Sequence, residues 1–198
     1  MEADMQEEKK RPSNFRLYEG LVERIAQQVV RTLNTQGKIE IEPSNIQEAQ
    51  VDLIAIMDDY LMRDRRLRDA VRERMSMLSL PFSERGSIRY QIAREWNHPL
   101  GRSVPNFLAN QFIYAFFNSG HVEEVYADDY TLRRTIEEIL DGFKVDEDQI
   151  REEAEKLIKN MDRSQLQYEI ELRKKMNEVR RRKGLIFERG PRRPQGNV

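Results

Sequence analysis

Apolar residues recur every three or four positions through most of the chain, the spacing that places them on one face of an α-helix. The first such stripe consists of Leu17, Leu21, Val22, Ile25, Val29 and Leu33. Residues typical of a helix start, Pro12-Ser13-Asn14, precede it, and Gly37 follows as a residue that tolerates a positive φ. The pattern predicts a helix of about 20 residues that ends near Gly37.

The next segment begins with an alternating stretch, Ile39–Ile41, which is typical of an extended chain. Ser44 and Gln47 have the spacing of a capping box, in which two side chains satisfy free amides at a helix start. The predicted helix then carries Ile46, Leu53, Ile54, Met57, Tyr60 and Leu61 on one side. A separate basic segment is predicted over residues 64–78. Its apolar side consists of Leu67, Ala70, Val71 and Leu78.

Residues 81–121 differ in composition, with few charges and frequent proline and glycine. We expect two compact helices here, about 88–97 and 104–117, packed on most sides because they carry so little charge. The side chains expected to be buried in this insert include Ile88, Ile92, Trp96 and Phe112. The aromatic residues of the second helix suit core packing better than base stacking, because no Lys or Arg is interleaved with them.

The helical pattern with many charges returns at Asp128 and ends at Gly142; its stripe is Leu132, Ile136, Ile139 and Leu140. Phe143–Val145 is predicted to be extended, and the acidic run from Asp146 to cap a further helix. The stripe of that helix is Ile150, Ala154, Leu157, Ile158 and Met161. A last helix is predicted over about 164–183, ended by Gly184.

The chain also shows an internal similarity, because residues 41–58 align without gaps to 145–162. The matched positions are Ile46 with Ile150, Leu53-Ile54 with Leu157-Ile158, and Met57-Asp58 with Met161-Asp162. Two Glu-rich helices can match in this way by chance, but the shared order of helix, extended piece and capped helix favours a repeat. The repeat predicts two pseudo-symmetric arms, with Ile39–Ile41 and Phe143–Val145 paired as a short ribbon.

The predicted fold is therefore all-α, with two pseudo-symmetric helical repeat arms and an aromatic-rich helical insert between them. The expected divisions are a disordered N-terminus (1–11), a first repeat (12–80), the insert (81–127), a second repeat (128–187) and a basic disordered tail (188–198).

Three segments carry a family resemblance: LVERIAQQVVRTLNTQGKIEIE, LRRTIEEILDGF and LRKKMNEVRRRKGLI. They resemble a bacterial family known only as domain of unknown function 507. The resemblance covers both arms, about two thirds of the chain, and excludes the insert. It implies an architecture, but the family offers no established catalytic residue to carry over.

Composition narrows the chemistry. The 198 residues include no cysteine, which excludes a disulfide scaffold and thiolate catalysis and favours a reducing compartment, so we expect a cytoplasmic protein. The two histidines, His98 and His121, lack metal-ligand spacing, and His98 before Pro99 is expected to be a turn residue. Adjacent carboxylates such as Asp58-Asp59 do not share a helix face. We expect no enzyme activity, no metal site and no cofactor.

Charge distribution is the most informative chemical feature. The chain carries 34 Lys and Arg against 35 Asp and Glu, yet residues 122–162 have a net charge of −8 and residues 163–198 one of +7. The residues predicted to bind a partner or an anion are Arg173, Lys174, Arg180, Arg181, Arg182, Lys183, Leu185, Phe187, Arg192 and Arg193. The competing interpretation is that the basic helix lies on the acidic helices of its own chain.

These features favour a noncatalytic protein-interaction or scaffold subunit of a larger assembly. The alternative is a nucleic-acid or ribonucleoprotein binder that uses the basic C-terminal helix and tail. An enzyme with acidic residues and a metal in the central segment is the least favoured class. A protein partner is expected, a membrane is not, and oligomerisation stays open.

Overall fold

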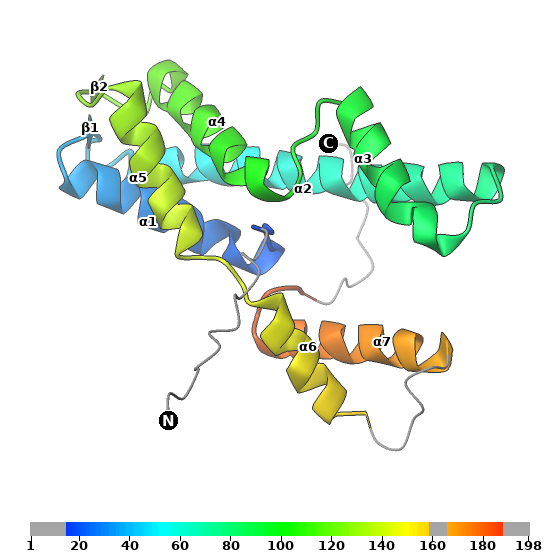
Figure 1. Cartoon of the computed structure of the whole chain (residues 1–198). Coiled ribbons are helices and arrows are strands. Elements are labelled where there is room, and N and C mark those ends of the chain that lie inside the picture. The colour runs from blue at the N-terminus through cyan, green and yellow to red at the C-terminus, as the bar shows by residue number, and fades with distance from the viewer. Residues whose placement is uncertain (1–14, 159–165, 188–198) are drawn as a thin grey trace, which may run out of the picture.

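The structure of the protein is a computed structural model that describes residues 15–158 and 166–187 (Figure 1). The described part is all-α, as predicted. Its α-helices are α1 (Val22–Thr35), α2 (Ile46–Met77), α3 (Arg85–Glu95), α4 (Val104–Asn118), α5 (Asp129–Asp141), α6 (Glu147–Lys156) and α7 (Leu166–Arg182). Three short 3₁₀ turns, Glu19–Leu21, Phe82–Glu84 and Gly101–Ser103, precede α1, α3 and α4, and two short strands, β1 (Ile39–Glu40) and β2 (Glu124–Val125), complete it.

Helices α1, α2, α4 and α5 enclose the main hydrophobic core, and with α3 and the two strands they form what we call the helical body (Figure 1). The predicted stripes face this core from all four helices: Ile25, Val29, Leu33, Leu53, Met57, Leu108, Phe112, Leu132, Ile136 and Leu140 have no exposed surface. Each such side chain contributes about 1.5–3 kcal/mol by its removal from water. The body is therefore held together by burial along four amphipathic helices.

Helix α2 is a single helix of 32 residues, so the prediction of two segments is wrong. Neither Gly nor Pro occurs between Ile46 and Met77, and nothing in the sequence stops the helix. Its first half packs into the main core. Its second half places Leu67 and Val71 in a smaller cluster with three residues of α3, namely Ile88, Ile92 and Ala93.

The start of α2 also differs from the prediction. Its N-cap is Asn45, and no side chain caps the helix. The Ser44 hydroxyl instead donates to the side chains of Glu42 and Asn45, so the predicted capping box is wrong. The predicted acidic cap at Asp146 is confirmed, because its side chain accepts from the Asp148 and Gln149 N–H groups, and Asp128 caps α5 in the same way by accepting from the Thr131 N–H.

Strand β1 pairs with β2 in an antiparallel ribbon, with Ile39 opposite Val125. The predicted pairing of Ile39–Ile41 with Phe143–Val145 is therefore wrong. Helix α5 packs on α1 and α4, and its 13 residues separate β2 from Phe143 by about 20 Å. The end of the α4–α5 connection lies beside β1, whereas Phe143 lies at the far end of α5.

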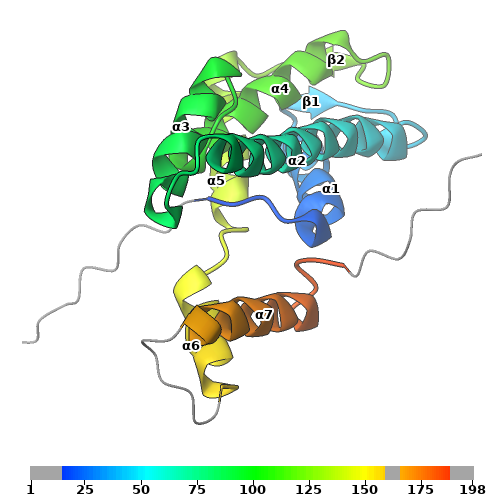
Figure 2. The same cartoon turned by 90° about the vertical axis from the view of Figure 1, so that its right-hand side faces the viewer.

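Helices α6 and α7 pack against each other and form a separate unit beside the body, which we call the C-terminal helix pair (Figures 1 and 2). One of its contacts with the start of the chain joins two backbones: the Gly20 N–H donates to the Leu185 carbonyl at 3.1 Å. A Cβ on Gly20 would lie 1.7 Å from the Gly184 carbonyl oxygen. Gly184 has a φ of +65° and ends α7 at the predicted place.

The pseudo-symmetry of the two repeat copies stays a prediction. The helices of the two copies have different packing partners. Helix α1 packs along α2, whereas α5 packs on α4 and α1, and α6 packs on α7. Leu53 is fully buried, whereas its counterpart Leu157 is 38% exposed in the turn that follows α6. Met161 lies outside the described residues, as do the predicted terminal segments 1–11 and 188–198.

The insert forms helices α3 and α4 close to the predicted ranges, and Ile88, Ile92 and Phe112 are buried as expected. Trp96 is 39% exposed, so its predicted burial is wrong. Trp96 is the C-cap of α3 and follows Ala93, the last residue of the helix that packs against α2. No helix in the described ranges is long and apolar enough to cross a membrane.

Candidate functional site

A cleft of about 1250 Å³ lies between the helical body and the C-terminal helix pair. Figure 2 shows α6 and α7 beneath the helical body. Eight arginines line it: Arg16, Arg68, Arg85, Arg89, Arg102, Arg151, Arg173 and Arg180. Four carboxylates accompany them, those of Asp64, Glu147, Asp148 and Glu169. The lining also includes apolar side chains, those of Phe15, Leu17, Leu100, Leu172 and Met176.

The body wall of the cleft is built on α2 and α3. Tyr60, Asp64 and Arg68 follow one another at four-residue spacing and therefore share one face of α2. Arg89 projects from α3 and donates to Asp64 Oδ1 at 2.9 Å, and the Arg68 guanidinium lies 3.5 Å from Asp64 Oδ2. Asp64 thus fixes one guanidinium from each of the two helices.

His98 lies directly behind this wall. Its side chain is fully buried, its ring stacks on Tyr60 with centroids 4.9 Å apart, and its Nε2 lies 3.7 Å from Asp64 Oδ1. Burial alone would raise the pKa of Asp64, but His98 and the charges of Arg89 and Arg68 outweigh it and lower this pKa. The turn predicted at His98 lies directly before it, at Trp96–Asn97, and the burial of the His98 ring was not predicted.

Tyr60 closes the inner end of this wall. Its hydroxyl donates to the Pro99 carbonyl at 3.3 Å, which ties α2 to the turn before α4. Burial, followed by the negative charge of Asp64, raises the pKa of Tyr60. The phenol is therefore a neutral hydrogen-bond donor in this site.

The opposite wall is formed by the C-terminal helix pair. Arg180 of α7, only 8% exposed, donates to Glu147 of α6 at 2.6 Å and to the Asn177 side chain at 3.0 Å. Arg16, from the segment before α1, places its guanidinium 3.5 Å from the other oxygen of Glu147. Glu147 therefore receives one arginine from its own helix pair and one from the start of the chain.

Arg16 connects the two walls electrostatically. Partial burial lowers its pKa; Glu147 and Asp64 act in the opposite direction, and the positive charges of Arg180 and Arg89 lower it further. Arg180 belongs to the helix pair and Arg89 to the body. Arg16 is thus close to charged groups of both walls, at the place where the walls meet.

Two of the cleft arginines also contact an aromatic ring outside the lining, that of Phe82. Phe82 is 66% exposed, and two guanidiniums lie near its ring, that of Arg85 at 5.7 Å and that of Arg173 at 5.9 Å from the ring centroid. Arg85 belongs to α3 and Arg173 to α7, so this aromatic ring is shared by the two walls. Arg102 is exposed nearby on the turn before α4.

Several buried polar atoms around this cleft have no hydrogen-bond partner. In the described part of the chain, six buried side-chain nitrogen and oxygen atoms lack a hydrogen-bond partner. Five of them belong to Arg89, His98, Glu147 and Arg180, on or directly behind the walls. Unpaired buried polar atoms are rare in proteins, and their concentration at one cleft indicates a place for a polar ligand.

The predicted binding residues are distributed over several environments. Arg173 and Arg180 line the cleft, on one face of α7. Lys174 and Lys183 lie in ion pairs with carboxylates of their own helix pair, Glu171 at 3.4 Å and Glu153 at 2.8 Å.

These ion pairs, with that between Arg180 and Glu147, agree with the interpretation that the basic helix lies on its own acidic helix. Arg181 and Arg182 are exposed beyond them. Leu185 is buried in the protein itself, whereas Phe187 is exposed, and partner binding by either residue stays a prediction. Arg192 and Arg193 lie outside the described residues.

Sequence reasoning missed the body wall. Asp64, Arg68, Arg85 and Arg89 received no role there, and neither did Arg16. The sequence pattern that could have indicated them is the four-residue spacing of Asp64 and Arg68 on α2 and of Arg85 and Arg89 on α3. This spacing places charged groups on one face of each helix. That the two faces meet each other, and meet α7, depends on the tertiary fold.

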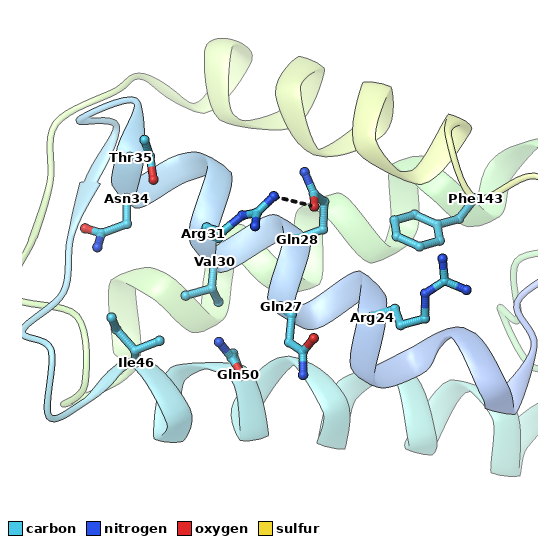
Figure 3. A pocket seen from close by; sticks show the side chains of 10 residues that line it. All are labelled: Arg24, Gln27, Gln28, Val30, Arg31, Asn34, Thr35, Ile46, Gln50 and Phe143. Carbon is cyan, nitrogen blue, oxygen red and sulfur yellow. Dashed lines mark hydrogen bonds between the residues drawn. The ribbon is translucent and has the colours of Figure 1, made fainter.

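A second, smaller hollow of about 530 Å³ lies between α1, the start of α2 and Phe143 (Figure 3). Its polar side chains are mostly amides, together with Arg24 and Arg31. Arg24 lies over the Phe143 ring at 5.7 Å, and Arg31 donates to Gln28 at 3.4 Å. Among the described residues, no group of three His, Cys, Asp or Glu side chains is placed to hold a metal ion.

The fold defines an all-α protein with a basic cleft between two helical units. The chain belongs to the family described as protein of unknown function (DUF507), whose family model matches residues 15–185. This match confirms the resemblance to the family and also covers the insert at residues 81–127, which the resemblance had excluded, while the two repeat copies stay a prediction. A comparison with curated proteins gives no match.

Proposed function

We propose that the protein is a noncatalytic interaction subunit that holds an anionic segment of a partner protein in the arginine-lined cleft. The observation that carries the proposal is the gathering of eight arginines on two facing walls of a chain whose net charge is −1. A cleft of about 1250 Å³ exceeds the roughly 300–1,000 Å³ typical of small-molecule sites, and it suits a polypeptide segment. The cysteine-free composition favours the cytoplasm for this role.

The lining favours a protein partner over a nucleic acid. Asp148, Glu169 and Glu147 line the helix-pair wall and repel a chain that carries a phosphate at every residue. Apolar side chains beside the arginines, such as Leu172 and Met176, offer contact for the apolar residues of an amphipathic segment. Arginine binds carboxylates through paired hydrogen bonds, which gives such a site direction as well as charge.

The test is recovery of the partner from cells that contain the native assembly, with a charge-reversed cleft. Arg102→Glu with Arg173→Glu reverses two exposed cleft arginines, neither of which forms an ion pair with another of the described residues. Arg66→Glu with Arg94→Glu is the matched control, because both are exposed on α2 and α3 and neither lines the cleft.

We expect the wild type and the control variant to retain the same partner after nuclease treatment, and the cleft variant to lose it. Equal recovery by both variants would overturn the proposal. All three proteins should give the same helical circular dichroism spectrum, which establishes that the folded state is being compared.

A nucleic-acid ligand is the second candidate, and one observation favours it. The exposed Phe82 ring between Arg85 and Arg173 has the combination of aromatic surface and guanidinium on which single-stranded bases stack. In this case, affinity for single-stranded RNA should fall steeply with salt, and Phe82→Ala should weaken it by about 1–3 kcal/mol. The basic tail with Arg192 and Arg193 would add phosphate contacts, which a variant lacking residues 188–198 tests.

A further inference from the structure

We propose that the inner end of the cleft, where Arg16 joins the two walls, binds a phosphoryl group carried by the partner segment. This inference rests on the proposed function, because it names the chemical group that the cleft recognises. The site consists of Arg16, Arg68, Arg89 and Arg180, together with the two carboxylates that hold them.

The charge balance of this site requires a dianion. Four guanidiniums meet two carboxylates, those of Asp64 and Glu147, which leaves a net charge of +2 with His98 counted as neutral. A phosphoryl group carries about −1.5 to −2 near pH 7, which balances this excess. A single carboxylate balances only half of it.

The energetic state of the arginines supports the same conclusion. Burial lowers the pKa of both Arg16 and Arg68, and charges of neighbouring arginines lower it further, against the opposite influence of the carboxylates. Repulsion between these arginines therefore raises the energy of the site when no anion is bound. An anion placed among these guanidiniums relieves that repulsion and gains Coulomb energy from several of them.

The donors needed for an oxyanion are present on both walls. The Nε atoms of Arg89 and Arg180 are buried and have no hydrogen-bond partner, and Arg180 as a residue is 92% buried. Every cation that lines the cleft is an arginine, whose planar fork binds two oxygens of one phosphoryl group. The four arginines come from the segment before α1, from α2, from α3 and from α7, and so approach from different directions. This arrangement suits a tetrahedral group better than a planar carboxylate.

One phosphoryl group on a polypeptide fits better than a polyphosphate chain. Asp148, which follows Glu147 in the sequence, and Glu169 also line the helix-pair wall and repel a second phosphate. The apolar side chains of Phe15 and Leu17 lie beside Arg16 in the sequence and in the lining, so the group next to the phosphoryl is expected to be uncharged.

The experiment is an NMR titration of the full chain with inorganic phosphate and with O-phosphoserine, at an ionic strength held constant with sodium chloride. We expect saturable shifts at the amides around Arg16, Arg89 and Arg180, and none when chloride alone is varied. Arg16→Gln should weaken phosphate binding at least about tenfold, because it removes a charge-assisted hydrogen bond. Arg31→Gln, an exposed arginine of the smaller hollow, is the control and should leave binding unchanged.

Three outcomes would overturn the inference: equal shifts with chloride, equal binding by Arg16→Gln, or malonate binding as tightly as phosphate. A short deoxythymidine oligonucleotide is the probe for the other phosphate source. If it binds more tightly than O-phosphoserine and depends on Arg16, the protein-borne phosphoryl is overturned. If the unfolding temperature of Arg16→Gln itself falls, Arg68→Gln takes its place.

The two proposals fail separately. Loss of the partner by the Arg102→Glu/Arg173→Glu variant, with no binding of phosphate at Arg16, leaves the interaction function standing and removes the phosphoryl group as its ligand. Phosphate binding at Arg16, with partner recovery unaffected by the reversed cleft, leaves an anion site that the partner does not use.

Discussion

The main core consists of buried apolar side chains and the arginine-lined cleft of charged ones, although α2 contributes to both. In the core, apolar side chains of four helices have no exposed surface. In the cleft, guanidiniums face one another across an open space, and hydrogen-bonding atoms such as Arg180 Nε are left unused. The core therefore stabilises the fold, whereas the cleft keeps charged groups and free hydrogen-bonding atoms that a ligand can use.

The two walls of the cleft differ in the same way. The body wall stands on α2, whose first half is anchored in the main core and whose second half packs on α3. The helix-pair wall is joined to the body by apolar residues such as Ile150 and Leu172, which belong to the same hydrophobic cluster, by the backbone contact at Gly20, and by the ion pair of Arg16 with Glu147. The body wall thus rests on two helices that pack along each other, and the other wall rests on the pairing of α6 with α7.

The largest expected effect lies in the core. Leu53→Ala removes a fully buried side chain from α2 and should lower the free energy of unfolding by about 2–5 kcal/mol, because it costs transfer energy and leaves a cavity. Chemical denaturation followed by circular dichroism measures this. A change below about 1 kcal/mol would contradict the assignment of Leu53 to a close-packed core.

The second effect separates the core from the cleft. Gly20→Ala introduces a methyl group where the Gly184 carbonyl lies 1.7 Å from the Cβ position, and neither backbone can move without breaking the contact with Leu185. We expect a loss of about 1–3 kcal/mol, of the size of overpacking, confined to the helix pair.

Hydrogen exchange followed residue by residue checks this prediction. Amide protection should fall in α6 and α7 and remain in α1 and α4. A uniform loss of protection through the body would show that the helix pair and the core unfold as one unit.

Local pattern was sufficient to predict most of the fold. Helix periodicity, the glycine stops at Gly37 and Gly184 and the acidic cap at Asp146 each depend on a few neighbouring residues, and the structure confirms them. The ribbon partner was wrong because pairing is decided by how α5 packs on α1, which no local pattern contains. The exposure of Trp96 was missed for the same reason.

The candidate site was harder to predict than the fold. Charge counted along the sequence indicated the basic end of the chain and so found Arg173 and Arg180. It could not find Arg16 or Arg89, because isolated arginines in mixed-charge segments gain meaning only when folding places them together. The four-residue spacing of Arg85 and Arg89 was the available signal, and it is also common on solvated helix faces.

A third, smaller effect tests the electrostatics of the body wall. Asp64→Asn removes the carboxylate that holds Arg68 and Arg89. Because Asp64 is partly exposed to solvent, we expect a loss of about 1–2 kcal/mol near pH 7, less than for a fully buried pair. The folded-state pKa of Asp64 is lowered, so its contribution is present above about pH 4 and is lost as the pH falls through that folded-state pKa.

Urea unfolding of the wild type and Asp64→Asn between pH 7 and pH 3 measures this dependence. The difference between the two proteins should be largest at pH 7 and should narrow in acid. A difference that stays constant with pH would mean that the Asp64 charge does not stabilise the wall, and that the loss comes from packing.

The smallest expected effect decides how far the two copies of the sequence similarity behave alike. Leu157 matches Leu53 in the alignment, but it is 38% exposed in the turn after α6 and has little apolar surface left to lose. Leu157→Ala should therefore lower the free energy of unfolding by less than about 1 kcal/mol, against about 2–5 kcal/mol for Leu53→Ala. Denaturant unfolding of both variants under one condition gives the ratio directly. Equal losses would mean that Leu157 is buried in solution as Leu53 is, and would favour two equivalent arms. A large ratio would mean that the similarity records only the amphipathic pattern that α2 and α6 share, because burial is set by what a helix packs against.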